Sequence, residues 1–348
     1  MFTSMSGRAA RTAPAAVGEF RRFAGRRGQV TMKEKDSKEE IGSMLRTVTG
    51  MIGEEEAGRI LEHEHVMVGF VEDGKLTPED YDADEVVAEV EPYLLELKKA
   101  GCSTFVDCAP EFLGRDPYVL KRLSERTGVR IIANTGYYKK PYLAPFVYRE
   151  DERELAARWV REAERGIGDS GVYPGFIKIA LNDGTAIDDT QQKILRAAMR
   201  ASLDTGLPIQ CHTIGDDVAA HAARLMEEAG FDRERFIWIH AQSSSDLTVP
   251  QRLAAQGMWI SIDSILPGTY DKHAELLRRL IELGVGDRIL LSQDTGWYTV
   301  GEERGGELKP YHRLFTDFFP FAAEQGLDAA WLERCVTRHA FEAMSLRK

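Results

Sequence analysis

The chain has 348 residues, 43% hydrophobic and 29% charged, which is enough for one large folded core or two ordinary ones. No apolar run reaches the length of about 18 residues that a membrane span requires. With a net charge of −11 and a pI of about 5.4, the chain is a poor candidate for binding nucleic acid or an anionic membrane. A small-molecule substrate is the expected partner.

The first part of the chain differs in charge from the rest. Residues 1–31 contain six arginines and one glutamate, and they lack the long apolar stretch of a secretory signal. We predict a basic, disordered extension over residues 1–45 and one folded domain over residues 46–348. Four cysteines without a CxxC pair favour a cytoplasmic protein, and targeting to an organelle through the Arg-rich segment is the alternative.

From residue 58 onward, short apolar runs alternate with amphipathic stretches. The apolar runs predict eight strands, over residues 59–66, 103–108, 129–136, 175–181, 207–213, 235–241, 258–264 and 288–294. Helical spacing predicts helices over residues 84–101, 116–128, 151–166, 189–206, 216–230, 244–257, 271–284, 310–326 and 328–346. Several of these helices begin near an Asp and end at a Gly, which are capping signals. Pro92 should kink its helix or mark its first turn.

Strands that alternate with helices indicate a mainly parallel sheet. Such a sheet is either open and doubly wound or closed into a (β/α)8 barrel. No glycine-rich dinucleotide motif follows the first strand, and the number and even spacing of the strands favour the barrel. We see no domain boundary after residue 58.

Polar side chains stand near the carboxyl ends of the predicted strands, where (β/α)8 barrels carry their chemistry. In "LEHEHV" two histidines lie one residue apart, and therefore on one side of a strand, because strand side chains alternate. A single histidine at such a position is more often a core or rim residue than a ligand, but six suitable residues at one mouth predict a metal site. These residues are His63, His65, Lys178, His212, His240 and Asp294.

Lys178 lies between Ile177 and Ile179, in a strand predicted to be buried on both faces. A buried ammonium is strongly disfavoured, so the amine either reaches water along its stem or loses its charge. A neutral amine can add carbon dioxide to give a carbamate, whose two oxygens can bridge two divalent metals. Four imidazoles, an aspartate and such a carbamate make a suitable ligand set for zinc or a similar ion.

The segments that carry these residues resemble the phosphotriesterase-like branch of the amidohydrolase superfamily. The resemblance covers about residues 55–345 and is carried by "GRILEHEHV", "GFIKIAL", "IQCHT", "WIHAQ" and "ILLSQDTGW", in this order. It implies a single (β/α)8 TIM barrel of the metal-dependent hydrolase type, with two divalent metal ions. Zn²⁺ is the expected metal, and Mn²⁺, Co²⁺ and Fe²⁺ are alternatives.

The resemblance also implies a role for each ligand. The more buried ion is bound by His63, His65 and Asp294, the more exposed ion by His212 and His240, and a carboxylated Lys178 bridges them. A hydroxide shared by the ions is expected to attack an ester-type centre, and Asp294 to take its proton and pass it on. Lactones are the expected substrates. Phosphotriesters of the organophosphate type are the alternative, and a barrel that binds a ligand without catalysis is a third hypothesis.

Three residues after the third strand are predicted to contact the substrate. Tyr138 is well placed for the tyrosine that lactonases of the family carry near the metals, and we count it among the catalytic candidates. Lys139 and Lys140 follow at once. Two cations suit an anionic substrate, such as a sugar lactone with a phosphate or carboxylate, whereas a solvated loop is the simpler interpretation for at least one of them.

Further substrate contacts are predicted at Asp263, Ser264 and Trp297. Acyl-homoserine lactonases of the family often have an arginine after the aspartate of strand seven, and Ser264 stands at that position here. This difference argues against such substrates. Trp297 belongs to the Gly-rich loop after Asp294 and is expected to line the pocket.

Two features are left without an assigned role. Glu62 stands where the family usually has a threonine, and strict alternation would place Glu62 and Glu64 against the helices, where a charge needs a partner.

The outer helices offer enough apolar surface for a homodimer, an expectation that rests on analogy with the fold.

Overall fold

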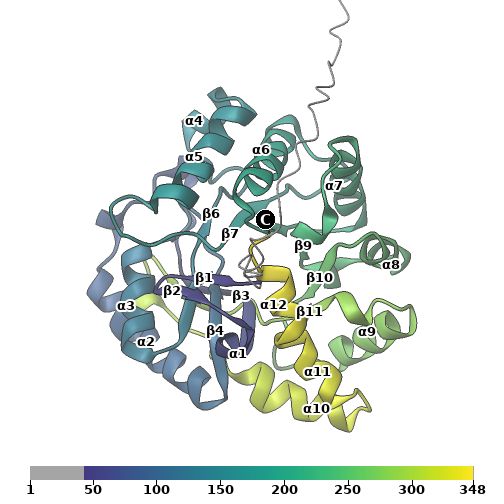
Figure 1. Ribbon diagram of the computed structural model, residues 1–348. Coiled ribbons are helices and arrows are strands. Elements are labelled where there is room, and N and C mark those ends of the chain that lie inside the picture. The colour runs from purple at the N-terminus through teal and green to yellow at the C-terminus, as the bar shows by residue number, and fades with distance from the viewer. Residues whose placement is uncertain (1–42, 348) are drawn as a thin grey trace, which may run out of the picture. The chain divides into compact units, whose positions relative to one another are not determined.

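The computed structural model describes residues 43–347, so most of the predicted N-terminal extension lies outside the described residues. A ring of parallel strands surrounded by helices forms this part of the chain (Figure 1). The ring consists of β3 (Arg59–Val68), β4 (Cys102–Asp107), β5 (Arg130–Ile132), β6 (Asn134–Thr135), β7 (Phe176–Ala180), β8 (Ile209–His212), β9 (Phe236–Ile239), β10 (Trp259–Ile262) and β11 (Ile289–Leu291). The predicted single (β/α)8 barrel is confirmed, with β5 and β6 together forming the third predicted strand.

Parallel pairing of neighbouring strands holds the ring together except where β11 meets β3. There the backbone N–H of Asp294 donates to the carbonyl of His63, and that of His65 donates to the carbonyl of Thr295, both at 3.1 Å. A further strand, β12 (Gly296–Thr299), then pairs in parallel with β3. The barrel is therefore closed by residues that belong to the predicted metal site or adjoin it.

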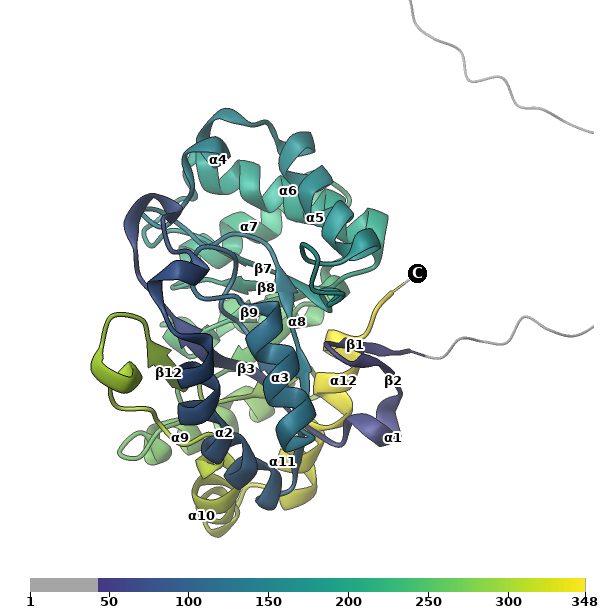
Figure 2. The ribbon, with the colours of Figure 1, turned by 90° about the vertical axis from the view of Figure 1, so that its left-hand side faces the viewer.

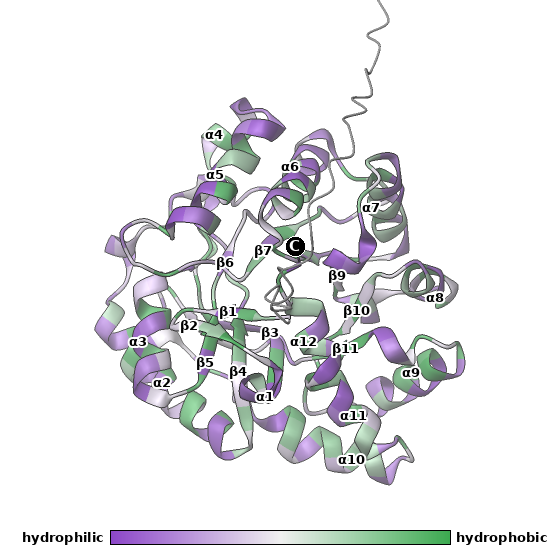
Figure 3. Ribbon diagram, in the orientation of Figure 1, coloured by the Kyte–Doolittle hydropathy of each residue, from purple (hydrophilic) through white to green (hydrophobic). Residues whose placement is uncertain are grey.

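Helices follow the strands and cover the outside of the ring. They are α2 (Ala83–Lys99), α3 (Pro117–Thr127), α4 (Pro145–Arg149), α5 (Glu152–Arg165), α6 (Asp189–Thr205), α7 (Asp216–Glu228), α8 (Thr248–Ala255), α9 (Tyr270–Glu282), α10 (Phe319–Glu324) and α11 (Ala329–Val336). Asp116 and Asp151 cap α3 and α5 through hydrogen bonds to backbone N–H groups, as predicted. Hydrophilic and hydrophobic bands alternate along these helices, which fits helices with one buried face (Figure 3).

The amino end of the ring is covered by β1 (Leu45–Thr47), β2 (Gly50–Ile52), α1 (Glu54–Ala57) and α12 (Arg338–Met344) (Figures 1 and 2). Leu45 and Ile52 pack with Phe341 and Met344 against Ile60 and other residues at the beginnings of the ring strands. Leu45 was assigned to the extension, yet it is fully buried here, because burial of a leucine contributes roughly 1.5–3 kcal/mol. The opposite, carboxyl end of the ring is left for the site.

Two helix predictions differ from the structure. The final helix is interrupted at Thr337, whose hydroxyl donates to the carbonyl of Glu333, and α12 continues in a new direction across the barrel floor. Pro92 lies in the interior of α2, which excludes the first turn as one of its two predicted alternatives and leaves the kink as a prediction. A π-helical turn, Leu314–Phe318, precedes α10 in the predicted helix over residues 310–326. Among residues 43–347, no helix combines the length and the apolar character needed to cross a bilayer.

Candidate metal centre

Three predicted ligands meet at the carboxyl end of the ring. His63 comes from β3, His240 follows β9 and Asp294 follows β11, and one ligand atom of each lies within 4.8 Å of the other two. His63 is 2% exposed and His240 8% exposed. Two imidazoles and a carboxylate at this separation can share a divalent metal ion.

His65 and Lys178 adjoin this group. The Nε2 atom of His65 lies 3.1 Å from Oδ1 of Asp294, and the same oxygen lies 3.9 Å from Nε2 of His63. Lys178 is 2% exposed, and its Nζ lies 3.1 Å from Nε2 of His63. The amine thus does not reach solvent along its stem, and it points at a ligand atom instead.

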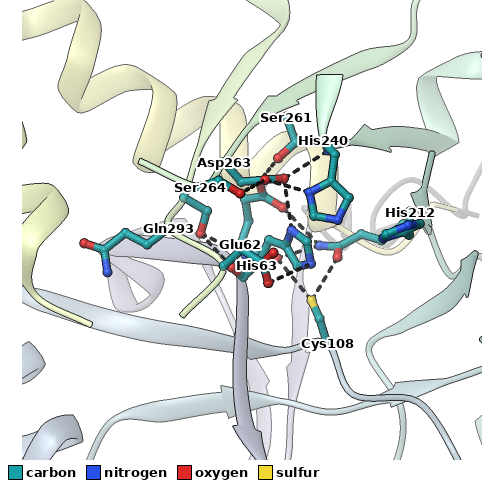
Figure 4. A network of polar contacts seen from close by, with 12 residues as sticks. Glu62, His63, Cys108, His212, His240, Ser261, Asp263, Ser264 and Gln293 are labelled. Carbon is teal, nitrogen blue, oxygen red and sulfur yellow. Dashed lines mark hydrogen bonds and ion pairs between the residues drawn. The ribbon is translucent and has the colours of Figure 1, made fainter. Parts of the chain in front are cut away.

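A single buried carboxylate orients two of the histidines (Figure 4). Asp263, at the end of β10, places Oδ2 at 3.1 Å from Nδ1 of His63 and Oδ1 at 2.7 Å from Nδ1 of His240. Gln242 donates to the same Oδ1 at 2.6 Å and accepts from the backbone N–H of Asp263 at 3.1 Å. Because both Nδ1 atoms face a carboxylate, each ring carries its proton there and turns Nε2 toward the centre.

His212, at the end of β8, lies beside His240, with 4.5 Å between the ring centroids. Its Nδ1 lies 3.3 Å from the hydroxyl of Tyr138, and its Nε2 lies 3.1 Å from Nζ of Lys139. Both ring nitrogens therefore have protein neighbours. For His212 to bind an ion through Nε2, the ammonium of Lys139 must move away from it.

The electrostatics of the site keep most of its imidazoles neutral. Burial lowers the pKa of His63 to about 3 and also lowers the pKa of His65 and of His212. The pKa of His240 is raised, because the charge of Asp263 and its hydrogen bond outweigh burial. Despite burial, the neighbouring histidines lower the pKa of Asp294 to about 2. Neutral imidazole and ionised carboxylate are the forms that bind metal ions.

These residues fit a divalent metal ion. Asp263 leaves Nε2 of two histidines directed at the centre, and Asp294 supplies an anionic oxygen beside them. Nδ1 of His65 is buried and has no hydrogen-bond partner within the described part of the chain. A buried imidazole nitrogen of this kind is expected to be satisfied by an ion or by ordered water.

The backbone around the centre adopts an uncommon conformation. His240, Ser264, Asp294 and Trp297 have positive φ values of 66°, 57°, 55° and 69°. For residues other than glycine, this region costs roughly 1–2 kcal/mol each. The first three follow the ends of strands β9, β10 and β11, and Trp297 lies in β12, so the unusual backbone is concentrated at the mouth of the barrel.

The structure separates the predicted substrate residues into two groups. Tyr138, Lys139 and Trp297 lie at the centre, and the Trp297 ring is 5.7 Å from that of His65. Lys140 turns away to an ion pair with Asp188, at 3.1 Å.

Of the other two predicted contacts, Asp263 lies behind the ligands, and Ser264 is half-buried beside it. Asp263 is fully buried behind the histidines, and Ser264 donates to it at 3.1 Å. A residue covered in this way supports ligands, so a direct substrate contact of Asp263 has no support in the geometry.

Glu62 is not directed at the helices as strict alternation predicted. The pairing of β3 with β4 is shifted between Leu61 and Glu64, and this irregularity turns Glu62 into the barrel. Its carboxyl group accepts hydrogen bonds from Ser261 of β10 and from Gln210 of β8 (Figure 4). Burial raises the pKa of Glu62 to about 8, so the neutral acid predominates at pH 7 and needs no counter-charge.

Sequence reasoning missed Gln242, although "WIHAQ" places it only two residues after His240. Its hydrogen bonds to Asp263 span two strand ends, and no periodicity in a single segment reveals such a contact. Sequence reasoning also gave no role to Glu64.

A closed barrel with a histidine and aspartate cluster at the carboxyl ends of its strands defines a TIM-barrel, metal-dependent hydrolase. Residues 43–339 match the Phosphotriesterase family, and the chain belongs to this family of binuclear metal enzymes. The resemblance noted in the sequence is thereby confirmed.

Several named relatives are similar over most of their length. A phosphotriesterase homology protein of Mycobacterium tuberculosis is 30% identical over 300 residues, covering 81% of this chain and 92% of the relative. An aryldialkylphosphatase of Saccharolobus solfataricus is 28% identical, covering 80% and 91%. An N-acetyltaurine hydrolase of Xenopus tropicalis is 23% identical, covering 73% and 84%.

Proposed function

We propose that the protein is a binuclear-metal hydrolase that opens a lactone or a related small carboxylic ester with an anionic group. The observation that carries this proposal is the placement of Tyr138 and Lys139 on the two nitrogens of His212, beside the ligand cluster. A phenol and an ammonium at this position offer a hydrogen-bond donor and a positive charge to a substrate in the centre.

The proposed ligands are those predicted from the sequence. At Lys178 a carbamate would form by addition of carbon dioxide to the amine with release of a proton, and it would supply an anionic group for two cations. His63, His65 and Asp294 would hold one ion and His212 and His240 the other, with Zn²⁺ as the proposed metal. When bound, two such ions supply an ionised water near neutral pH and polarise the scissile carbonyl.

The side chains of the chain handle the proton and orient the substrate. Asp294, which is ionised at neutral pH, accepts the proton of the nucleophile on a carboxylate oxygen and delivers it to the departing alkoxide. Burial raises the pKa of Tyr138, so its hydroxyl stays protonated and can donate to a substrate oxygen. In a lactone, the alkoxide remains attached to the acyl group, so one proton transfer completes ring opening.

Lys139 makes an anionic substrate the better fit. Its Nζ lies 2.9 Å from Oδ1 of Asp183, whose side chain is 65% exposed, and its own side chain is 16% exposed. The exposed carboxylate is a weak competitor, because solvent-exposed ion pairs contribute at most about 1 kcal/mol. A substrate carboxylate or phosphate can take its place and draw Lys139 away from His212.

Hydrolysis of organophosphate triesters is the second candidate function. It is favoured by the similarity to the aryldialkylphosphatase of Saccharolobus solfataricus over 80% of this chain. A neutral triester gains nothing from Lys139, so the two candidates differ in what they require of this residue. N-acetyltaurine, which the name of another relative implies as a substrate of that protein, is a useful anionic amide for comparison.

Purified protein loaded with zinc in bicarbonate should be assayed on neutral and phosphorylated sugar lactones, acyl lactones, N-acetyltaurine and paraoxon. We expect the highest kcat/KM on an anionic lactone, and a Lys139→Met variant should lose at least tenfold on that substrate but not on its neutral analogue. Efficient turnover of paraoxon with none of any lactone would refute the lactonase proposal and support the second candidate.

A further inference from the structure

The glutamate between the two histidines of β3 has a set of contacts that the predicted site does not use. Glu64 is fully buried, and its carboxyl group is turned toward the segment 292–295, which follows β11. Oε1 accepts from Oγ of Ser292 at 2.7 Å and from the backbone N–H of Gln293 at 2.8 Å. Oε2 accepts from the backbone N–H and from Oγ1 of Thr295, at 2.7 and 3.0 Å.

These contacts enclose Asp294 from both sides. The two backbone N–H groups that Glu64 binds belong to the residues immediately before and after Asp294. Asp294 itself has a φ of 55°, and its own N–H donates to the carbonyl of His63. A left-handed aspartate between two anchored peptides has its side-chain direction fixed by those anchors, because φ and ψ set where Cβ points.

We propose that Glu64 is the positioning residue that holds Asp294 in the orientation needed to bind metal. The inference rests on the proposed function only in that it takes Asp294 to be a ligand. Glu64 acts through the backbone and contacts no other predicted ligand by its side-chain hydrogen bonds. Because Glu64 lies between His63 and His65, strand β3 supplies two of the predicted ligands and also fixes the position of Asp294.

Glu62 provides a matched control. It is also fully buried, stands two residues earlier on β3, and has hydrogen bonds to side chains of Ser261 and Gln210. Replacement of either glutamate by glutamine puts an amide donor into a buried hydrogen-bond network, which destabilises the fold in both cases. The two variants therefore resemble one another in loss of stability and differ in whether the Asp294 segment is released.

The first test uses metal-free protein, so it does not depend on the proposed function. We expect the amides of Gln293 and Thr295 in Glu64→Gln to exchange with deuterium at least tenfold faster than in the wild type, and to keep wild-type rates in Glu62→Gln. Protection left unchanged in Glu64→Gln would overturn the proposal. If Glu64→Gln fails to fold, Thr295→Val removes one of the four hydrogen bonds, and a smaller increase at the same amides is expected.

The second test measures the consequence for the ligand. Protein loaded with zinc is mixed with an excess of chelator, and we expect Glu64→Gln to release zinc at least tenfold faster than the wild type, because outer-shell changes typically cost 10–100-fold in affinity. Glu62→Gln should remain within threefold. Equal release by both glutamine variants would overturn the positioning role. A wild-type protein that binds no zinc would instead refute the proposed function, while the exchange result would still decide whether Glu64 holds the segment.

Discussion

The carboxylate that orients two histidines offers the sharpest test of the metal centre. Asp263 accepts from Nδ1 of His63 with one oxygen and from Nδ1 of His240 with the other, and it is fully buried. Asp263→Asn keeps the size of the side chain but leaves only one oxygen. Whichever histidine meets the new amide NH₂ must move its proton to Nε2, where a proton prevents metal binding.

The magnitude follows from these two contacts. Asn retains an acceptor for one histidine and loses the other hydrogen bond, and a bond to a charged group contributes about 1.5–3 kcal/mol. Loss of one outer-shell partner typically lowers metal affinity 10–100-fold, which corresponds to about 1.4–2.7 kcal/mol. The two figures agree, so we expect zinc to bind roughly 10–100-fold more weakly in Asp263→Asn.

The assay is competition for zinc with a chelator of known affinity, together with the metal content of the purified protein. Glu162→Gln is the control, because it disrupts a partly buried ion pair between α5 and Arg115, a residue in the loop before α3. A zinc affinity of Asp263→Asn within threefold of the wild type would refute the reasoning, as would an equal loss of affinity in Glu162→Gln.

Two further predictions concern substitutions at the same centre. Lys178→Ala should lose bridged metal and at least 100-fold in kcat, and short carboxylic acids should restore part of both, whereas full activity without them would exclude a bridging role. Tyr138→Phe should keep its zinc content, measured by elemental analysis, and lose about tenfold in kcat on lactones, the scale expected for the loss of one hydrogen bond to the substrate.

In the metal-free protein, His63, His65 and His212 should each contribute less stability as the pH falls below about 6.5, because their pKa values are lowered and the unfolded chain then binds more protons. Each can contribute a slope of up to about 1.4 kcal/mol per pH unit. Glu62 and Glu64 act in the opposite direction, because burial raises the pKa of each to about 8 and the folded chain then holds more protons. The difference in unfolding free energy between the wild type and His63→Gln, measured with urea at several pH values, isolates one histidine. It should shrink by up to about 1.4 kcal/mol per pH unit below pH 6.5, and a constant difference would contradict the neutral state of His63.

The barrel could be predicted because its signals are local. Each strand is an apolar run bounded by turns, and caps such as Asp116 and Asp151 mark the helices one at a time. The floor of the barrel could not be predicted in this way. Leu45 and Met344 lie almost 300 residues apart in the chain but share one apolar cluster, and no pattern within either segment indicates that the two are in contact.

In the candidate site, too, the positions of residues along the chain could be predicted, whereas contacts between distant segments could not. His212, His240 and Asp294 stand at or just after strand ends, and His63 and His65 lie in the second half of the predicted strand over residues 59–66, so topology alone predicts that they meet. The sequence shows that Asp263 stands at a strand end and so suggests a substrate contact, but it does not show the direction of the side chain. The direction of Glu62 was wrong for a related reason, since period-two alternation fails at the shifted pairing between Leu61 and Glu64.

The residues that close the barrel and those that are proposed to bind metal are partly the same. Where β11 meets β3, the contacts include the backbone bonds of Asp294 and His65 and the four hydrogen bonds of Glu64. An ion held by His63 and Asp294 would join these two strands once more, across the part of the ring that has no regular ladder. Metal binding and closure of the barrel should therefore stabilise one another, because a ligand that binds only the closed ring shifts the equilibrium toward it.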